Sequence, residues 1–222
     1  MDELLRFAID YWQLILELAW QHVLLTWSAL AIAMALGIAT AIIATRSKRF
    51  GAVLLAGANI AQAVPSIAVL GLVVPILGIG FTPAVFALVL RAILPIFLNT
   101  YLGIRGVERA NTEAARGVGM RDWEILAMVE LPLAAPIMIA GIRTAAVEGV
   151  AIATLAAFIG AGGLGDLILQ GIALLDAPRL LSGAIPAALL AISMELLFGA
   201  LEAWTVSRIR RRPWAKKSVV GR

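Results

Sequence analysis

Five apolar stretches, each long enough to cross a lipid bilayer, constrain the fold of this chain more than any other feature. A membrane-spanning helix needs about 20 predominantly apolar residues. The apolar stretches lie at residues 22–45, 51–78, 81–102, 132–159 and 180–206. The second contains Val64-Pro65, and because proline interrupts a helix, we expect a kinked or broken helix there. With 62% hydrophobic and 14% charged residues, the chain is predicted to be an all-α integral membrane protein with five transmembrane helices.

Lysine and arginine gather in three clusters outside these stretches. Of the 18 basic residues, three lie at residues 46–49, four at 105–121 and seven from residue 208 onward. The positive-inside rule assigns all three clusters to the cytoplasmic side, which predicts an N-terminus outside and a C-terminus in the cytoplasm. This placement also argues against the nucleic-acid partner that the basic character of the chain would suggest.

The ends of the chain differ in charge. Residues 1–21 carry acidic side chains and apolar residues at helical spacing, which predicts an interfacial amphipathic helix at the outer surface rather than a cleaved leader. Residues 22–207 are expected to form the transmembrane domain, and residues 208–222 a basic cytoplasmic tail. His22, the only histidine, is expected at the water boundary, and since the chain has no cysteine, no metal site is predicted.

A charged loop, EAARGVGMRDWEILAMVELP, occupies residues 113–132 between the third and fourth stretches. Its charges exclude it from hydrocarbon, yet its alanines favour helix, and Gly117 and Gly119 favour a turn. A second periodic apolar run then leads to Pro132, which suits the start of a new helix because its missing N–H would be unpaired there. The pattern predicts a short helix, a glycine turn and a second short helix.

This loop resembles the EAA loop of ABC importer permeases, EAA-x3-G-x9-I-x-LP, with Val129 at the isoleucine position. In that family the loop is the coupling helix that docks in a groove of the cytoplasmic ATPase. The resemblance therefore assigns ATPase coupling to Glu113, Ala114, Ala115, Gly119, Leu131 and Pro132. Other stretches resemble the osmoprotectant branch, the permeases for glycine betaine, choline, carnitine and related quaternary ammonium compounds. They are His22 and residues 62–68, 95–100, 141–145, 153–165 and 183–187.

The resemblance also implies partners. They are a cytoplasmic ABC ATPase dimer, an extracytoplasmic substrate-binding protein and a second permease chain, identical or related, within the lipid of a bacterial or archaeal cytoplasmic (inner) membrane. The chain has no G-x-x-x-x-G-K-[ST] motif, so ATP and Mg are expected on the separate ATPase, with no cofactor and no enzymatic activity in this chain. Residues 160–165 match G-x-G-x-x-G, but they follow a membrane helix rather than a strand. We expect a tight turn there, followed by a short surface helix around residues 166–175.

Polar residues inside the apolar stretches are candidates for the translocation pathway, because they are costly in lipid. At helical spacing they form one-sided stripes, although the same groups could instead stabilise helix contacts. The candidates are Asn59, Gln62, Pro65 and Ser66 on the second stretch, Arg91 and Asn99 on the third, and Thr144 and Glu148 on the fourth.

Arg91 and Glu148 are expected at similar depths near the middle of the membrane. A lone charge there costs on the order of 2.5 to 3.5 kcal/mol, so we predict that the two pair, within one chain or across a dimer axis. The alternative is that Arg91 reaches a watery cavity and Glu148 is protonated or paired elsewhere.

The sequence thus predicts the permease subunit of an ABC importer for a quaternary ammonium osmoprotectant. One alternative is a permease for methionine or another small solute, because the EAA loop is shared across importers. The other is an ion-coupled secondary transporter or channel in which Arg91, Glu148 and Glu195 form an ion relay. The solute itself is expected to be selected by the separate binding protein.

Overall fold

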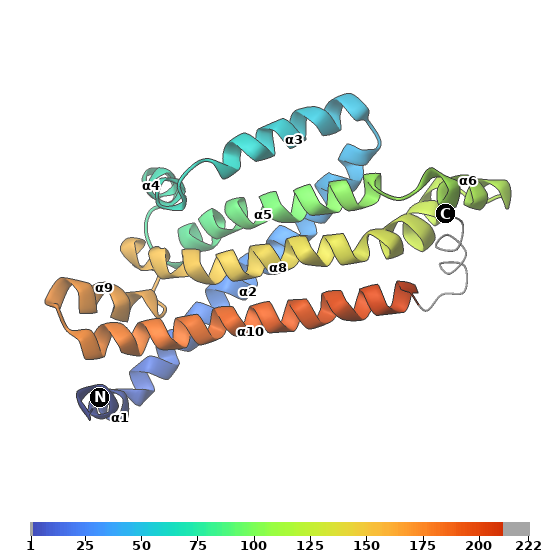
Figure 1. The fold of residues 1–222 in the computed structure, drawn as a ribbon. Coiled ribbons are helices and arrows are strands. Elements are labelled where there is room, and N and C mark those ends of the chain that lie inside the picture. The colour runs from blue at the N-terminus through green and yellow to red at the C-terminus, as the bar shows by residue number, and fades with distance from the viewer. Residues whose placement is uncertain (1, 211–222) are drawn as a thin grey trace.

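Four long helices form the body of the computed structural model, which describes residues 2–210 (Figure 1). Each lies in a helical segment that is long and apolar enough to cross a membrane. No strand occurs between residues 2 and 210, so the predicted all-α architecture is confirmed. The long helices are α2 (Trp12–Thr45), α5 (Phe81–Arg105), α8 (Leu131–Leu155) and α10 (Ala177–Arg210).

Shorter helices connect and extend this body. Two lie at the N-terminal end and after the α8 region: α1 (Asp2–Asp10) and α9 (Gly165–Leu174). The rest are α3 (Lys48–Gln62), α4 (Ser66–Leu77), α6 (Arg109–Gly117), α7 (Asp122–Ile125), a π-helical turn (Leu126–Glu130) and a 3-10 turn (Ala156–Ile159).

The second apolar stretch is broken, as the proline predicted. Helices α3 and α4 are bent by 98° at the short break between them. Pro65 has φ −59° and ψ 136°, and a proline disfavours helical geometry in the residue before it. Figure 1 shows α3 running back along the bundle from the end of α2, and α4 lying at the opposite end before α5 begins.

Small residues let the long helices approach closely. A Cβ atom placed on Gly141 of α8 would lie 2.6 Å from the Asn99 Cβ and 2.7 Å from the Pro95 carbonyl oxygen of α5. Close backbone approach at small residues is typical of membrane helix packing, where lipid supplies no hydrophobic drive. Aliphatic side chains fill the remaining core, among them the fully buried Leu25, Leu30, Leu88 and Ile96.

The N-terminal boundary differs from the expectation. The first helix ends at Asp10, and α2 already begins at Trp12. Residues 12–21 contain neither proline nor glycine, so nothing in this segment interrupts α2. The depth expected for His22, at the water boundary, stays a prediction, but its side chain is enclosed by the protein. His22 is 0% exposed, and its Nε2 atom lies 3.1 Å from the Val150 carbonyl oxygen of α8.

The glycine-rich run at residues 160–165 makes the tight turn that the sequence predicted, and α9 follows it. Gly160, Gly162 and Gly163 have φ of 70°, 75° and 85°, a region open to glycine but strained for other residues. The Gly163 N–H donates to Gln21 Oε1 at 3.1 Å. Since helices flank this turn, it lacks the strand that a dinucleotide site requires.

The first two basic clusters and the start of the third, as far as residue 210, fall at one end of the bundle. Figure 1 shows the α2–α3 turn, α6 and the end of α10 together there, opposite α1 and α9. Most of the expected basic tail, residues 211–222, lies outside the described residues.

Candidate functional site

The loop between α5 and α8 has the predicted helix–turn–helix form. Helix α6 ends at Gly117, and Gly119, two residues later, has φ 84°. The Gly119 N–H donates to the Arg116 carbonyl at 2.9 Å, and the Met120 N–H to the Ala115 carbonyl at 3.1 Å. These two bonds define a Schellman motif, which ends a helix through a left-handed residue, usually glycine. Beyond the turn, α7 is the second short helix.

The hydrogen bonds explain the spacing of the EAA-x3-G pattern. Ala115 is 6% exposed and accepts the longer of the two bonds, while Gly119 supplies the left-handed turn four residues later. Both residues therefore shape the loop. Glu113 and Ala114 are exposed, so their side chains are free for another surface.

Polar contacts fix the rest of the loop. The Arg121 N–H donates to Glu124 Oε2 at 2.6 Å, which caps the start of α7. Arg116 and Asp122 form an exposed ion pair across the turn at 3.5 Å, and such surface pairs contribute about 0–1 kcal/mol. Glu130 lies 3.6 Å from Arg46, which ties the loop to the end of α2. The partly buried Leu131 and Pro132 begin α8, as expected.

Three large apolar side chains stand exposed on the loop. Val118 is 79% exposed, Trp123 62% and Met128 64%. Since exposed apolar groups rimmed by polar ones mark interaction sites, this surface suits docking of another protein.

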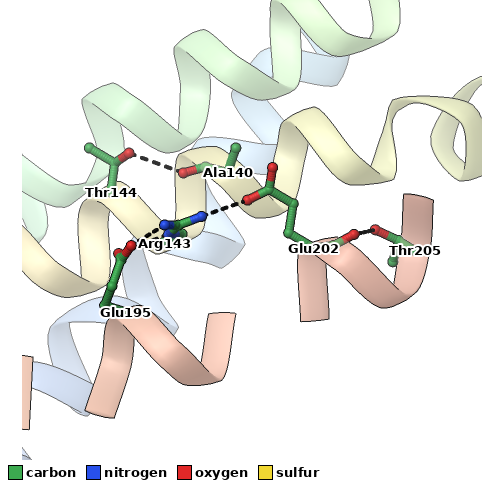
Figure 2. A network of polar contacts seen from close by, with 6 residues as sticks. All are labelled: Ala140, Arg143, Thr144, Glu195, Glu202 and Thr205. Carbon is green, nitrogen blue, oxygen red and sulfur yellow. Dashed lines mark hydrogen bonds and ion pairs between the residues drawn. The ribbon is translucent and has the colours of Figure 1, made fainter. Parts of the chain in front are cut away.

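A network of charged side chains joins α8 to α10 within the membrane-spanning region. Figure 2 shows Arg143 between Glu195 and Glu202. Arg143 Nε donates to Glu195 Oε2 at 2.8 Å, its Nη2 atom to Glu195 Oε1, and its Nη1 atom to Glu202 Oε2 at 3.1 Å. The two glutamates share one face of α10, two turns apart. Gly199 lies between them, and a Cβ atom there would be 3.6 Å from the guanidinium carbon.

Two cavities meet at this network. One of about 440 Å³ is lined by Arg143, Thr144, Glu148, Glu195 and Glu202, among others. The second, of about 480 Å³, extends along α10 past Arg143 and Glu202 to Ser207. Charged groups inside a membrane span usually face a bundle interior or a water-filled cavity rather than lipid. The α8–α10 face is therefore the best candidate wall of a pathway.

The predicted pathway residues of α8 lie in this site. Thr144 donates to the Ala140 carbonyl of its own helix at 3.0 Å. Glu148 is exposed and has no hydrogen-bond or ion-pair partner among the described residues. Asn99 lies elsewhere: its Nδ2 atom donates to the Pro95 carbonyl at 2.9 Å, beside Gly141.

Arg91 has a different partner from the expected one. Its Nη1 atom donates to the carbonyl oxygens of Ala61, Gln62 and Val64 at 3.4, 3.3 and 3.1 Å. The Ala61 carbonyl also accepts the Val64 N–H at 3.3 Å, and the guanidinium supplies a donor to the carbonyls of Gln62 and Val64 at the break after α3. Arg91 and Glu148 therefore form no ion pair within the described chain, which corrects that expectation, while a contact across a dimer axis stays a prediction.

The remaining candidates surround the same break. Asn59, Gln62 and Pro65 are exposed, and Ser66 begins α4 beyond the 98° bend. The bend interrupts the single stripe that the sequence predicted for Asn59, Gln62 and Ser66.

The sequence-based prediction missed Arg143 and Glu202 as site residues. A signal was present, because Glu195 and Glu202 are seven residues apart on one helix and Arg143 lies in the middle of the fourth apolar stretch. Three charges in two spans require mutual pairing.

A bundle of apolar helices with an EAA-type loop at its basic end defines the permease subunit of an ABC importer. The chain belongs to the family described as the binding-protein-dependent transport system inner membrane component, whose pattern matches residues 11–211. It is thus a non-enzymatic transport subunit of a multi-pass membrane family that works with a separate ATPase and a binding protein.

Relatives of known function cover nearly the whole chain. It is 40% identical over 202 residues to the carnitine transport permease protein of Listeria monocytogenes, covering 91% of this chain and 93% of that one. It is 39% identical to the choline transport system permease protein of Bacillus subtilis (strain 168), covering 82% and 84%. The inward-facing methionine ABC transporter shares the fold, with a TM-score of 0.80 at 18% identity over 88% of this chain and 98% of that chain.

Proposed function

We propose that this chain forms part of the pathway of an importer for quaternary ammonium osmoprotectants such as glycine betaine, choline and carnitine. The observation that carries the proposal is the 40% identity to a carnitine permease along 91% of the chain. The likeness to the methionine transporter, at 18% identity, concerns the fold alone. A methionine permease is therefore the weaker alternative.

The cavities at the α8–α10 face suit such solutes. Glu148, Glu195 and Glu202 supply three carboxylates against the single guanidinium of Arg143. An excess of carboxylates favours a cationic head group by simple charge attraction. Arg143 would in turn attract the carboxylate of glycine betaine or carnitine.

Five spans with an outer N-terminus and a cytoplasmic C-terminus account best for the arrangement. Figure 1 shows α2 and α5 running in the same direction, so the bent α3–α4 pair between them would serve as the second crossing. All three basic clusters then face the cytoplasm, as the positive-inside rule requires. In this topology α1, the first part of residues 1–21, lies at the outer interface, α2 continues from Trp12 into the transmembrane domain of residues 22–207, and residues 208–222 form the basic tail.

The loop from α6 to the π-helical turn would then dock on a cytoplasmic ABC ATPase dimer. Its exposed Val118, Trp123 and Met128 supply apolar contact, and the exposed Glu113 supplies a charge. ATP and Mg would bind only to that ATPase. The half-exposed charges of the α8–α10 face would meet a second permease chain, identical or related, around a shared aqueous pathway in the bacterial or archaeal inner membrane.

Transport in a defined system tests the proposal. Proteoliposomes would contain the chain, its ATPase and the binding protein, and uptake of radiolabelled glycine betaine, choline, carnitine and methionine would be compared with and without ATP. The proposal predicts ATP-dependent uptake of at least one quaternary ammonium solute and none of methionine. Uptake by the chain alone, driven by an ion gradient, would instead establish a secondary transporter.

A further inference from the structure

Helix α3 is held against the bundle near both ends. At its start, a Cβ atom on Gly51 would lie 2.6 Å from the Tyr101 hydroxyl oxygen, so the backbone of α3 abuts α5 there. At its end, Arg91 of α5 donates to the Ala61 carbonyl of α3 at 3.4 Å and to the Val64 carbonyl just beyond it at 3.1 Å. Between these contacts a cavity of about 590 Å³ opens among α2, α3 and α5.

The lining of this cavity is almost wholly apolar. It includes Val53 and Leu54 of α3, which are joined by Ile43, Ile93, Leu94 and Phe97 from α2 and α5. Thr40 also contributes, but its hydroxyl already donates to the Leu36 carbonyl of its own helix at 2.7 Å. Ile43 is 60% exposed and Val53 69%, so the cavity is open at this side. A polar solute would find no hydrogen-bond partner there, whereas a hydrocarbon chain needs none.

Basic side chains stand next to the cavity at the α2–α3 turn. Ile43 and Arg46 are three residues apart, and Arg49 and Val53 four apart, so each pair shares a helix face. Arg46 is 46% exposed beside Glu130, and Arg49 is exposed with no ion pair among the described residues. An apolar cavity beside cations at the end of a membrane span matches the two parts of an anionic lipid.

We propose that the α2–α3–α5 cavity binds an acyl chain of an anionic phospholipid, whose phosphate lies against Arg46 and Arg49. The site is separate from the charged cavities of α8 and α10, so it does not depend on the proposed solute. Because α3 carries small residues toward the cavity, among them Gly57, Ala58 and Ala61, the lipid chain would supply the packing that these residues lack.

Two matched glycine variants test the acyl-chain part. Gly57 lines the cavity, and a Cβ atom there would meet nothing within 4 Å, so Gly57→Leu fills the space without a backbone clash. Gly71 of α4 has equally open surroundings but lies outside the cavity, which makes Gly71→Leu the control. Native mass spectrometry of the full chain, titrated with phosphatidylglycerol or phosphatidylcholine in one detergent, measures binding.

Wild type and Gly71→Leu are expected to prefer phosphatidylglycerol, and Gly57→Leu to lose about tenfold or more in affinity for it, since each buried methylene contributes. Arg49→Gln should weaken phosphatidylglycerol binding about fivefold and leave phosphatidylcholine binding unchanged. Equal binding of both lipids by wild type would overturn the proposal, as would unchanged phosphatidylglycerol binding in Gly57→Leu.

A photo-cross-linking side chain at Val53 gives a readout that does not depend on the glycine variants. In native membranes it should capture a phospholipid, identified by mass spectrometry. Capture of a second copy of this chain instead would assign the cavity to a protein interface and overturn the lipid site.

Discussion

The Nη1 atom of Arg143 donates to Oε2 of Glu202 at 3.1 Å, which ties the middle of α8 to the C-terminal part of α10. Because Arg143 also holds Glu195, one guanidinium on α8 is the shared counterion of two carboxylates on α10. Its removal leaves both without a counterion, an arrangement that is costly inside a membrane.

We expect Arg143→Gln to abolish ATP-driven uptake and to lower the thermal unfolding temperature of the purified chain. Arg6→Gln, which removes an equal charge from the exposed surface of α1, is the control and should change neither. Adding Glu195→Gln and Glu202→Gln to Arg143→Gln should restore the unfolding temperature, because neither former partner of Arg143 then carries a charge. If the Arg143→Gln protein were as stable and active as wild type, the charged network would have no role in the pathway.

Arg91 and Glu148 should behave as independent sites within one chain. Since Arg91 contacts the carbonyls at the end of α3 and not Glu148, the effects of Arg91→Ala and Glu148→Ala on the free energy of unfolding should add within about 0.5 kcal/mol. Chemical unfolding of the two single variants and the double variant measures this. A larger coupling would indicate that the residues meet across a dimer axis.

The close contact between α5 and α8 predicts a stability effect. Gly141→Val would press against Asn99 and the Pro95 carbonyl, and overpacking of this kind costs about 1–3 kcal/mol. Gly149→Ala is the control, because its nearest neighbour would be the Thr26 methyl carbon at 3.6 Å, an ordinary contact. Thermal unfolding in detergent should separate the two variants, and equal unfolding temperatures would contradict the packing described.

Orientation is open to a labelling test, because the chain has no cysteine. In intact cells Ser47→Cys should be shielded from a membrane-impermeant thiol reagent, while Asp176→Cys, at the α9–α10 turn, should react. Permeabilised cells provide the control in which both react. Labelling of Ser47→Cys from outside would reverse the proposed topology.

Local features of this fold could be predicted from the sequence. Each apolar stretch is long enough to cross a membrane as a helix, which its length and composition alone indicate. The EAA-x3-G spacing encodes a Schellman turn whose bonds join residues five or fewer positions apart. Pro65 likewise predicts a break, because its effect on the backbone is local.

Partners distant in the sequence could not be predicted in the same way. Arg91 and the carbonyls of residues 61–64 meet only because the bend turns α4 away and exposes the end of α3. His22 is buried because this part of α2 packs on α8, where its Nε2 atom lies 3.1 Å from the Val150 carbonyl oxygen. The cavity beside Arg143 depends on the relative rotation of α8 and α10, which hydropathy does not specify.

Coupling through the α6–α7 loop is the central claim, and Gly119 tests it most directly. A β-branched residue at φ 84° costs about 1–2 kcal/mol or more, yet a Cβ atom at Gly119 would meet nothing within 4 Å. Gly119→Val should therefore disturb the turn without disturbing the bundle. Gly119→Asn is the matched control, because asparagine tolerates left-handed geometry.

The decisive measurement is ATP-driven glycine betaine uptake, together with ATPase co-purification, in proteoliposomes that hold equal amounts of each permease variant. The account predicts that Gly119→Val loses both uptake and the bound ATPase, while Gly119→Asn keeps most of each. Wild-type uptake and ATPase binding by Gly119→Val would contradict it.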